Sequence, residues 1–336
     1  MVPNAPSQTA EAVCLMRAME QRRPAGERIL DDPYARLFLS RLARAALASW
    51  EASGALGAAA VRLSPGLAAY IVTRHRFIDD CLRRALARSV EQLVLLGAGY
   101  DSRAYRFAGA LKGRPVFEVD FPATSRRKAR IVARAGGQLP SVDVRAVEID
   151  FATDSLEQRL REAGFRARRP CFFVWEGVSM YLTRDAVKAT LATIRELTAA
   201  RSELVMDFWH LLDSPDLLTS AYRMSANLLS LLGEPVTFGI HPEDVSPFLA
   251  RLGYRVLDLA DAGELERRYV RDRRRVVPGC YLVHAATTAS APPKQRIASQ
   301  SSAISRAVDT RAGARARAGA GVKSDQLHPS PKRRPR

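Results

Sequence analysis

Short apolar stretches recur between Leu93 and Trp209, separated by longer segments with helical periodicity. Each stretch is about five or six residues long and nearly continuously apolar, as expected of strands buried on both faces of a sheet. The stretches are QLVLLG, RPVFEVD, DVRAVEID, CFFVWEG and ELVMDFW. The helical segments between them are ATSRRKARIVARAGG, SLEQRLREAGF and RDAVKATLATIREL. Because alternating strands and helices form parallel sheets, this pattern predicts an α/β fold.

The two ends of the chain have different patterns. Helical periodicity dominates before Leu93, whereas the pattern loosens after Trp209. Near the end, SPFLARLGYRVLDLA and VPGCYLVHAATT predict a helix and two strands that close the sheet as an antiparallel pair. We therefore expect an N-terminal helical cover over residues 1–88 and a core over residues 89–290, with an insert at about 211–240 that acts as a lid.

The charge of the chain is unevenly distributed. Its 336 residues carry a formal net charge of +17, which raises the possibility of nucleic-acid binding. Residues 291–336 contain eleven Lys or Arg and two Asp, so about half of the excess lies there. Their Ala, Gly, Ser, Pro and Arg bias cannot build a core and predicts a disordered basic tail. We expect no nucleic-acid partner, although a nucleic-acid-binding protein that uses this tail as an arm remains an alternative.

Other features bear on compartment and metal binding. The four cysteines lie far apart with no CxxC, and only Cys280 has a histidine nearby, His284, so neither a metal site nor disulfides are expected. No window approaches eighteen consecutive apolar residues, and the first residues lack a secretory pattern. We expect a cytoplasmic protein with no membrane partner, and the pattern does not define an oligomeric state.

The stretch LVLLGAGYDSRAYRF runs from the first predicted strand into a turn that contains Gly97 and Gly99. In open parallel sheets this first turn usually contacts the ligand, and glycine lets the backbone approach it closely. Ser102 stands three residues after Gly99, where a dinucleotide fingerprint has another glycine. A pyrophosphate is therefore not expected on this turn, and a nicotinamide-dependent dehydrogenase is the weakest alternative.

The next two predicted strands end in acidic residues. Asp120 lies about twenty residues after Gly99, the position from which a carboxylate binds both hydroxyls of a ribose. Asp150 ends the following strand, where it could accept from an adenine amino group while Phe151 packs on the ring. Acids for ribose and adenine without a phosphate cradle fit an adenosyl compound that lacks phosphate, S-adenosylmethionine.

The amino-acid end of that cofactor needs charged partners. The upstream helix GLAAYIVTRHRFIDD offers Arg74 and Arg76, and an arginine can bind a carboxylate with two parallel hydrogen bonds. Two residues apart on a helix, these side chains point roughly 200° apart, so only one can face the cofactor.

Three candidate catalytic residues follow the fourth and fifth predicted strands. Glu176 in FVWEGVSMYL would face the cofactor's ammonium or the methyl-transfer centre, or else cap the next helix. Tyr181 would line the acceptor pocket or lie in the core. His210 ends DFWH and is the histidine best placed by sequence for general-base catalysis, although a lone histidine there is usually structural.

Five motifs, in this order and spacing, carry a family resemblance: RHRFIDD, LVLLGAGYDSRAYRF, FEVDFPAT, EIDF and FVWEGVSMYL. Together they resemble the leucine carboxyl methyltransferase family, including its bacterial branch of polyketide O-methyltransferases, which ERILDDPYARLF also resembles. The resemblance covers roughly residues 8–285. It implies a class I, Rossmann-like methyltransferase with a seven-stranded, mostly parallel sheet, helices on both faces and S-adenosylmethionine as cofactor.

The resemblance also assigns residues to roles. It places the cofactor carboxylate on Arg74, where the following His75 replaces a more usual threonine and is either a filler or a substrate-facing group. The remaining cofactor-binding residues that it implies are Gly97, Gly99, Asp120, Asp150, Phe151 and Glu176.

We expect methyl transfer to a substrate oxygen, namely a carboxylate of a small molecule or natural product of secondary metabolism. A carboxylate is already ionised at neutral pH, so this reaction needs no base. Transfer to a phenolic hydroxyl is the alternative, and it would require a base such as His210 or His75.

Overall fold

The computed structural model describes residues 7–53, 66–151, 153–199, 201–210 and 236–288. The predicted basic tail, residues 291–336, and residues 211–235 of the predicted lid lie outside the described residues.

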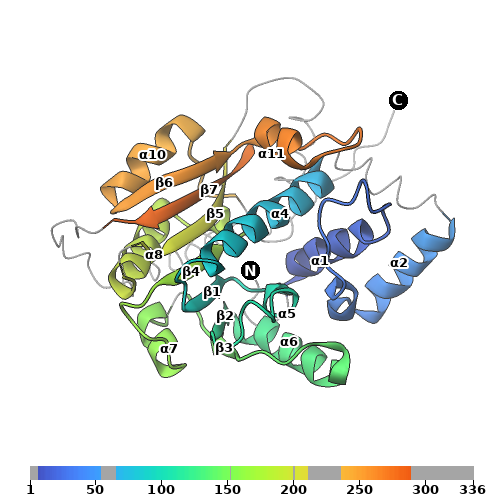
Figure 1. The fold of residues 1–336 in the computed structure, drawn as a ribbon, viewed down its shortest axis with the longest axis horizontal. Helices are drawn as coiled ribbons and strands as arrows, with labels where there is room; N and C mark the ends of the chain where they lie inside the picture. Colours follow the sequence, from blue (N-terminus) through green and yellow to red (C-terminus); the bar gives the residue numbers. More distant parts are fainter. Residues whose placement is uncertain (1–6, 54–65, 152, 200, 211–235, 289–336) are drawn as a thin grey trace, which may run out of the picture.

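A seven-stranded sheet runs through the centre of the molecule in the order β3-β2-β1-β4-β5-β7-β6 (Figure 1). Neighbouring strands among the first five are parallel, and β7 pairs antiparallel with both β5 and β6. This architecture confirms the predicted α/β class and the closing antiparallel pair. The strands are β1 (Gln92–Leu96), β2 (Val116–Asp120), β3 (Val144–Glu148), β4 (Cys171–Trp175), β5 (Glu203–Trp209), β6 (Tyr254–Ala260) and β7 (Cys280–Thr287).

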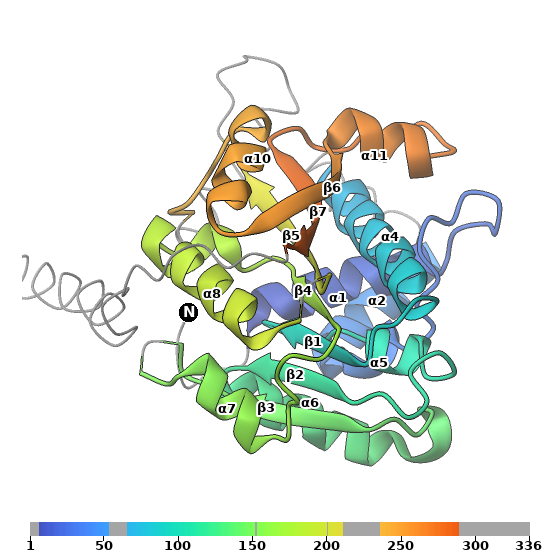
Figure 2. The same cartoon turned by 60° about the vertical axis from the view of Figure 1, so that its left-hand side comes forward.

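Helices cover both faces of the sheet (Figure 2). Alternate residues of β1 serve opposite faces: Leu93 and Leu95 belong to one hydrophobic cluster, and Val94 and Leu96 to the other. The first cluster includes residues of α1 (Gln8–Glu20), α4 (Leu67–Leu86), α6 (Pro122–Ala135) and α11 (Ala262–Tyr269). The second includes residues of α7 (Leu156–Glu162), α8 (Arg184–Leu197) and α10 (Pro242–Arg251). Burial on both faces explains why the central strands are continuously apolar.

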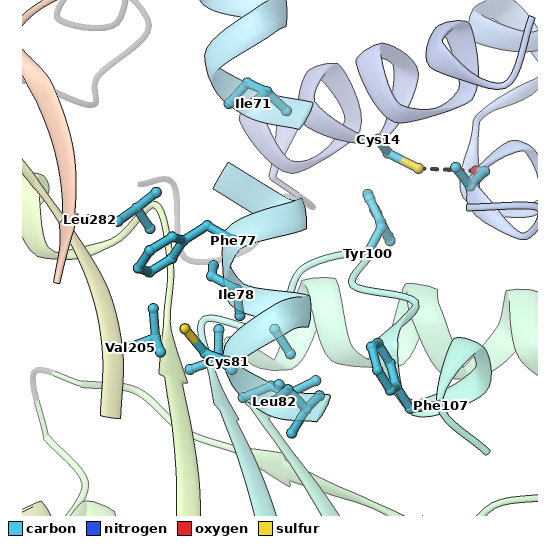
Figure 3. Packing of buried hydrophobic residues seen from close by; sticks show 14 of the residues in the cluster. Cys14, Ile71, Phe77, Ile78, Cys81, Leu82, Tyr100, Phe107, Val205 and Leu282 are labelled. Atoms are coloured by element: carbon cyan, nitrogen blue, oxygen red, sulfur yellow. Dashed lines mark hydrogen bonds between the residues drawn. The ribbon is translucent and has the colours of Figure 1, made fainter. Parts of the chain in front are cut away.

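Helix α4 packs directly on the sheet as part of the first cluster. Figure 3 shows Phe77, Ile78 and Cys81 of this helix beside Val205 of β5 and Leu282 of β7. The stretch with the RHRFIDD motif is therefore held rigidly against the strands.

The N-terminal segment predicted as helical divides into shorter elements. After α1 come a 3-10 turn, η1 (Ala35–Phe38), and α2 (Arg41–Ser53), with Ser40 between them. The Ser40 hydroxyl accepts from the main-chain N–H of Ala43 at 3.1 Å, which is how an N-cap starts a new helix. Helix α1 also contacts η1, because the Cys14 thiol donates a hydrogen bond to the carbonyl of Ala35 (Figure 3). Across the described ranges, no helix is long and apolar enough to span a bilayer.

Candidate functional site

A cavity of about 530 Å³ opens at the carboxyl ends of β1, β2, β4 and β5, with α1 and α4 as side walls. Open parallel sheets bind their ligands at this edge. The sheet side of the lining includes Gly97, Ala98, Gly99, Asp120, Phe121, Phe151, Glu176, Gly177, Val178 and Trp209. The helical side includes Ala10, Val13, Met16, Arg17, Leu67, Ile71, Arg74 and His75.

The turn after β1 needs its glycines. Gly97 has a φ of +68°, and a Cβ there would lie 2.3 Å from Cγ2 of Val178. Its N–H and that of Ala98 both donate to the carbonyl of Val119, at 2.9 and 3.1 Å, which fixes the turn on β2. A Cβ on Gly99, whose φ is +49°, would lie 3.1 Å from Cβ of Ala10 in α1. Backbone conformation and close packing thus both exclude a side chain at Gly97.

Asp120 ends β2 and faces this turn. Its two carboxylate oxygens accept from the main-chain N–H groups of Gly99, at 2.5 Å, and Phe121, at 2.7 Å. Burial raises the pKa of the Asp120 carboxyl, against the effect of these two hydrogen bonds. The acid is therefore held rigidly in the cavity wall, with oxygen lone pairs left for a ligand.

Two aromatic rings lie beside Asp120. Phe121 and Phe151 both line the cavity and meet edge to face, with their centroids 5.9 Å apart. Asp150 is not among the described residues that line the cavity, and its main-chain N–H donates to the carboxylate of Asp154 at 3.0 Å. Of the predicted adenine pair, the structure therefore places Phe151, and not Asp150, among the described lining residues.

The side chains of Arg74 and Arg76 point in different directions from α4. Arg74 lines the cavity and is 3% exposed, whereas Arg76 pairs with Asp80 outside it at 3.1 Å. Arg74 donates from Nε to Glu176 at 2.8 Å and from Nη1 to Asp207 at 3.0 Å. Two of its three guanidinium nitrogens are therefore already engaged with protein carboxylates.

Glu176 lies at the centre of a buried ion-pair network. One carboxylate oxygen accepts from Arg74 and the other from Nη1 of Arg103 at 2.8 Å. Burial alone would raise the pKa of Glu176, but the two arginines hold it below its usual value. Glu176 is therefore ionised at neutral pH.

His75 also lines the cavity, beside Glu176. Its Nδ1 lies 2.8 Å from the carbonyl of Ile71 and 3.1 Å from Oε1 of Glu176, so Nδ1 carries the proton and donates it. Burial, and then the positive charges of Arg103 and Arg17, lower the pKa of His75 well below its usual value. The imidazole is therefore neutral, and its contact with Glu176 is a hydrogen bond rather than an ion pair.

Tyr181 and His210, the two residues predicted to act on the methyl acceptor, differ in their position relative to the cavity. Tyr181 lines the cavity, but His210 is not among its described lining residues. The His210 ring lies 5.3 Å from that of His241 and 5.8 Å from that of Tyr281, and burial lowers its pKa. In the part of the chain that the structure describes, no three His, Cys, Asp or Glu residues are grouped to hold a metal.

Sequence reasoning missed several charged residues of the site. Arg17 of α1 lines the cavity, and it donates to Asp32 at 2.6 Å and to the carbonyl of Tyr100 at 2.6 Å. Arg103 bridges Glu176 and Asp79, which lie far apart in the sequence. The available signals were the places of Arg103 in LVLLGAGYDSRAYRF and of Asp79 in RHRFIDD, and Asp207 as an acid between apolar residues in ELVMDFW.

The strand order, the antiparallel β7, the glycine turn after β1 and the acid that ends β2 define a class I methyltransferase fold. Two solved structures share it. A DUF574 family protein from Streptomyces avermitilis aligns with a TM-score of 0.55 and 12% identity, over 84% of this chain and 98% of that one. A "putative methyltransferase" from Thermobifida fusca aligns with a TM-score of 0.53 and 14% identity, over 85% and 96%. At these identities the likeness concerns the fold alone.

The chain belongs to the leucine carboxyl methyltransferase family, whose sequence model matches residues 10–195. This match confirms the resemblance inferred from the motifs. Relatives named "Putative S-adenosyl-L-methionine-dependent methyltransferase" include one from Parafrankia sp., 36% identical over 59% of this chain and 62% of the relative. Others are from Streptomyces coelicolor, 37% identical over 58% and 66%, and Mycobacterium avium, 31% identical over 73% and 82%. The matched region thus spans less than two thirds of the first two relatives.

Proposed function

We propose that this protein is an S-adenosylmethionine-dependent methyltransferase that methylates a carboxylate oxygen of a small-molecule acceptor. Family membership and the names of the relatives support the cofactor and the reaction class. The observation that carries the proposal is the cavity at the strand ends, which combines a glycine turn, a fixed acid at Asp120 and a charged pair at Arg74 and Glu176.

The residues of the cavity fit the parts of the cofactor. Asp120 would accept from the ribose hydroxyls, and the edge-to-face pair of Phe121 and Phe151 would contact the adenine, with Asp150 kept as a predicted partner of its amino group. Ionised Glu176 would accept from the ammonium. When bound, S-adenosylmethionine supplies an electrophilic methyl group on a sulfonium.

Arg74 remains the predicted partner of the cofactor carboxylate. Because Nε and Nη1 already donate to Glu176 and Asp207, the hydrogen bonds to a ligand would come chiefly from Nη2. The structure thus supports a more restricted contact between Arg74 and the cofactor carboxylate than the two parallel hydrogen bonds that an unengaged guanidinium can donate.

The lining of the cavity also contains many apolar side chains, which suit an apolar acceptor. They include Val13, Met16, Leu67, Ile71, Met180, Tyr181 and Trp209. Such walls exclude water around the reacting oxygen and hold the acceptor in line, and positioning of this kind is worth roughly 7–11 kcal/mol.

The placement of two histidines favours a carboxylate acceptor over a phenol. Burial and the positive charges of Arg103 and Arg17 hold the pKa of His75 well below its usual value, which makes this imidazole a weak base, and His210 is not among the described residues of the lining. A carboxylate is ionised at neutral pH and needs neither imidazole as a base.

Matched acceptors test this proposal. The purified protein is incubated with methyl-labelled S-adenosylmethionine and pairs of apolar molecules that differ only in a carboxylic acid, phenol or alcohol group. We expect label only in the acids, as esters that mild alkali hydrolyses. Alkali-stable ethers from the phenols would overturn the carboxylate assignment, and no binding of S-adenosylhomocysteine in calorimetry would overturn the methyltransferase assignment itself.

A pair of arginine variants tests the cofactor site. Arg74→Lys should bind S-adenosylhomocysteine about tenfold more weakly and adenosine equally well, because adenosine lacks the carboxylate. Arg76→Lys is the matched control and should change neither affinity, since Arg76 lies outside the cavity. A selective loss in the control instead would transfer the role to Arg76.

A further inference from the structure

Asp207 is a buried carboxylate near the end of β5 that the proposed function does not use. It is 0% exposed, and it accepts hydrogen bonds from three separate groups. Oδ1 accepts from the main-chain N–H of Gly177 at 2.8 Å, and Oδ2 accepts from Nη1 of Arg74 at 3.0 Å and from the Tyr70 hydroxyl at 3.3 Å. Asp207 therefore joins β5 to α4 and to the turn after β4.

These partners are the immediate neighbours of the cofactor's predicted amino-acid end. Gly177 follows Glu176 directly and has a φ of +69°, and a Cβ there would lie 3.5 Å from both Nη1 and Nη2 of Arg74. One oxygen of Asp207 thus fixes the backbone that carries Glu176. The other oxygen fixes the guanidinium that pairs with Glu176.

The chemistry of this position requires a carboxylate. All three partners are donors, so both oxygens of Asp207 must accept. An asparagine of the same shape would place its NH₂ group against either Gly177 or Arg74, and one donor would face another. It would also remove one of the two negative charges that balance Arg74.

We propose that Asp207 is a positioning residue, which holds Arg74 and the Glu176–Gly177 turn in the arrangement that receives the amino-acid end of the cofactor. This inference rests on the proposed function. Because Arg74 keeps Asp207 as a partner, Glu176 can turn to a ligand ammonium without leaving the guanidinium buried and unpaired.

The test compares Asp207→Asn with a matched variant on the same strand. Glu203 lies at the opposite end of β5, is 5% exposed, and pairs with His284 at 2.7 Å and Arg88 at 3.0 Å. Glu203→Gln therefore also neutralises a buried, paired carboxylate, but away from the cavity. Each protein is titrated with S-adenosylhomocysteine and with adenosine, and its fold is checked by circular dichroism.

We expect Asp207→Asn to bind S-adenosylhomocysteine about tenfold more weakly and adenosine unchanged, because only the former has an amino-acid end. Glu203→Gln should keep the wild-type ratio of the two affinities even if its melting temperature falls. Equal changes for both ligands in Asp207→Asn, or none, would overturn the positioning role.

If Asp207→Asn does not fold, Asp207→Glu decides by the same criterion. It keeps the charge but moves the oxygens by one methylene, so Gly177 and Arg74 cannot both keep their hydrogen bonds. Failure of the wild-type protein to bind S-adenosylhomocysteine would overturn the proposed function and this inference with it. If the wild-type protein binds and the Asp207 variant binds equally well, only the positioning role is overturned.

Discussion

Replacing Gly97 with alanine would test how the glycine turn is built. An L-residue at the left-handed φ of +68° costs roughly 1–2 kcal/mol. The new Cβ would lie 2.3 Å from Cγ2 of Val178, so either Val178 or the turn must move, and such overpacking typically costs about 1–3 kcal/mol. We therefore expect Gly97→Ala to lower the free energy of unfolding by about 2–5 kcal/mol.

Three further variants separate the two costs: Gly113→Ala, Val178→Ala and the double variant that combines Val178→Ala with Gly97→Ala. Gly113 has a φ of +74° and nothing within 4 Å of its missing Cβ, so Gly113→Ala should lose only the conformational part, about 1–2 kcal/mol. In a Val178→Ala background the contact is gone, and Gly97→Ala should there cost about as little as Gly113→Ala.

Urea denaturation of the four variants and the wild type gives these free energies. Equal losses for Gly97→Ala and Gly113→Ala would refute the packing argument, as would the absence of relief in the Val178→Ala background. Because Gly97 and Val178 both line the cavity, the double variant should also bind S-adenosylhomocysteine more tightly than Gly97→Ala alone.

Three other outcomes are expected. Asp120→Asn should stay folded but bind S-adenosylhomocysteine about ten- to a hundredfold more weakly, because it loses a charged acceptor; an unchanged affinity in calorimetry would remove Asp120 from the site. A chain that ends at residue 290 should bind this ligand as the full chain does, and a loss of binding would show the predicted boundary to be wrong. Burial raises the pKa of Cys14 to about 11 and those of Cys81 and Cys171 to about 12. At pH 8 these thiols stay protonated, so a disulfide reagent should label them only as fast as the protein unfolds; rapid labelling of the native protein would contradict this burial.

The sequence predicted the sheet because burial on both faces leaves a direct mark on each strand. Every residue of β4 and β5 is buried, so β4 is continuously apolar, and in β5 only the paired acids Glu203 and Asp207 interrupt the apolar residues. Asp120 was predictable for a related reason, because the end of β2 and the turn after β1 are adjacent in any sheet of this order.

The rest of the site depends on packing between distant segments. Helical geometry shows that only one of Arg74 and Arg76 can face the cavity, but the direction is set by how α4 lies on the sheet. In the sequence, Arg17 cannot be distinguished from the many surface arginines, because its partners, Asp32 and the carbonyl of Tyr100, come close to it only in the folded protein. Asp207 lies 133 residues from Arg74, and no spacing rule connects them.

The place of β7 in the sheet has a consequence for biosynthesis. This strand, Cys280–Thr287, is the last of the described strands in chain order, yet it lies between β5 and β6 and pairs with both. During synthesis, one edge of β5 therefore stays unpaired until the ribosome has released the chain as far as residue 287, the end of β7. An open apolar edge of this kind invites pairing with other chains. Refolding of the complete chain, in which β7 is present from the start, should accordingly suffer less aggregation than release of a chain that stops before Cys280.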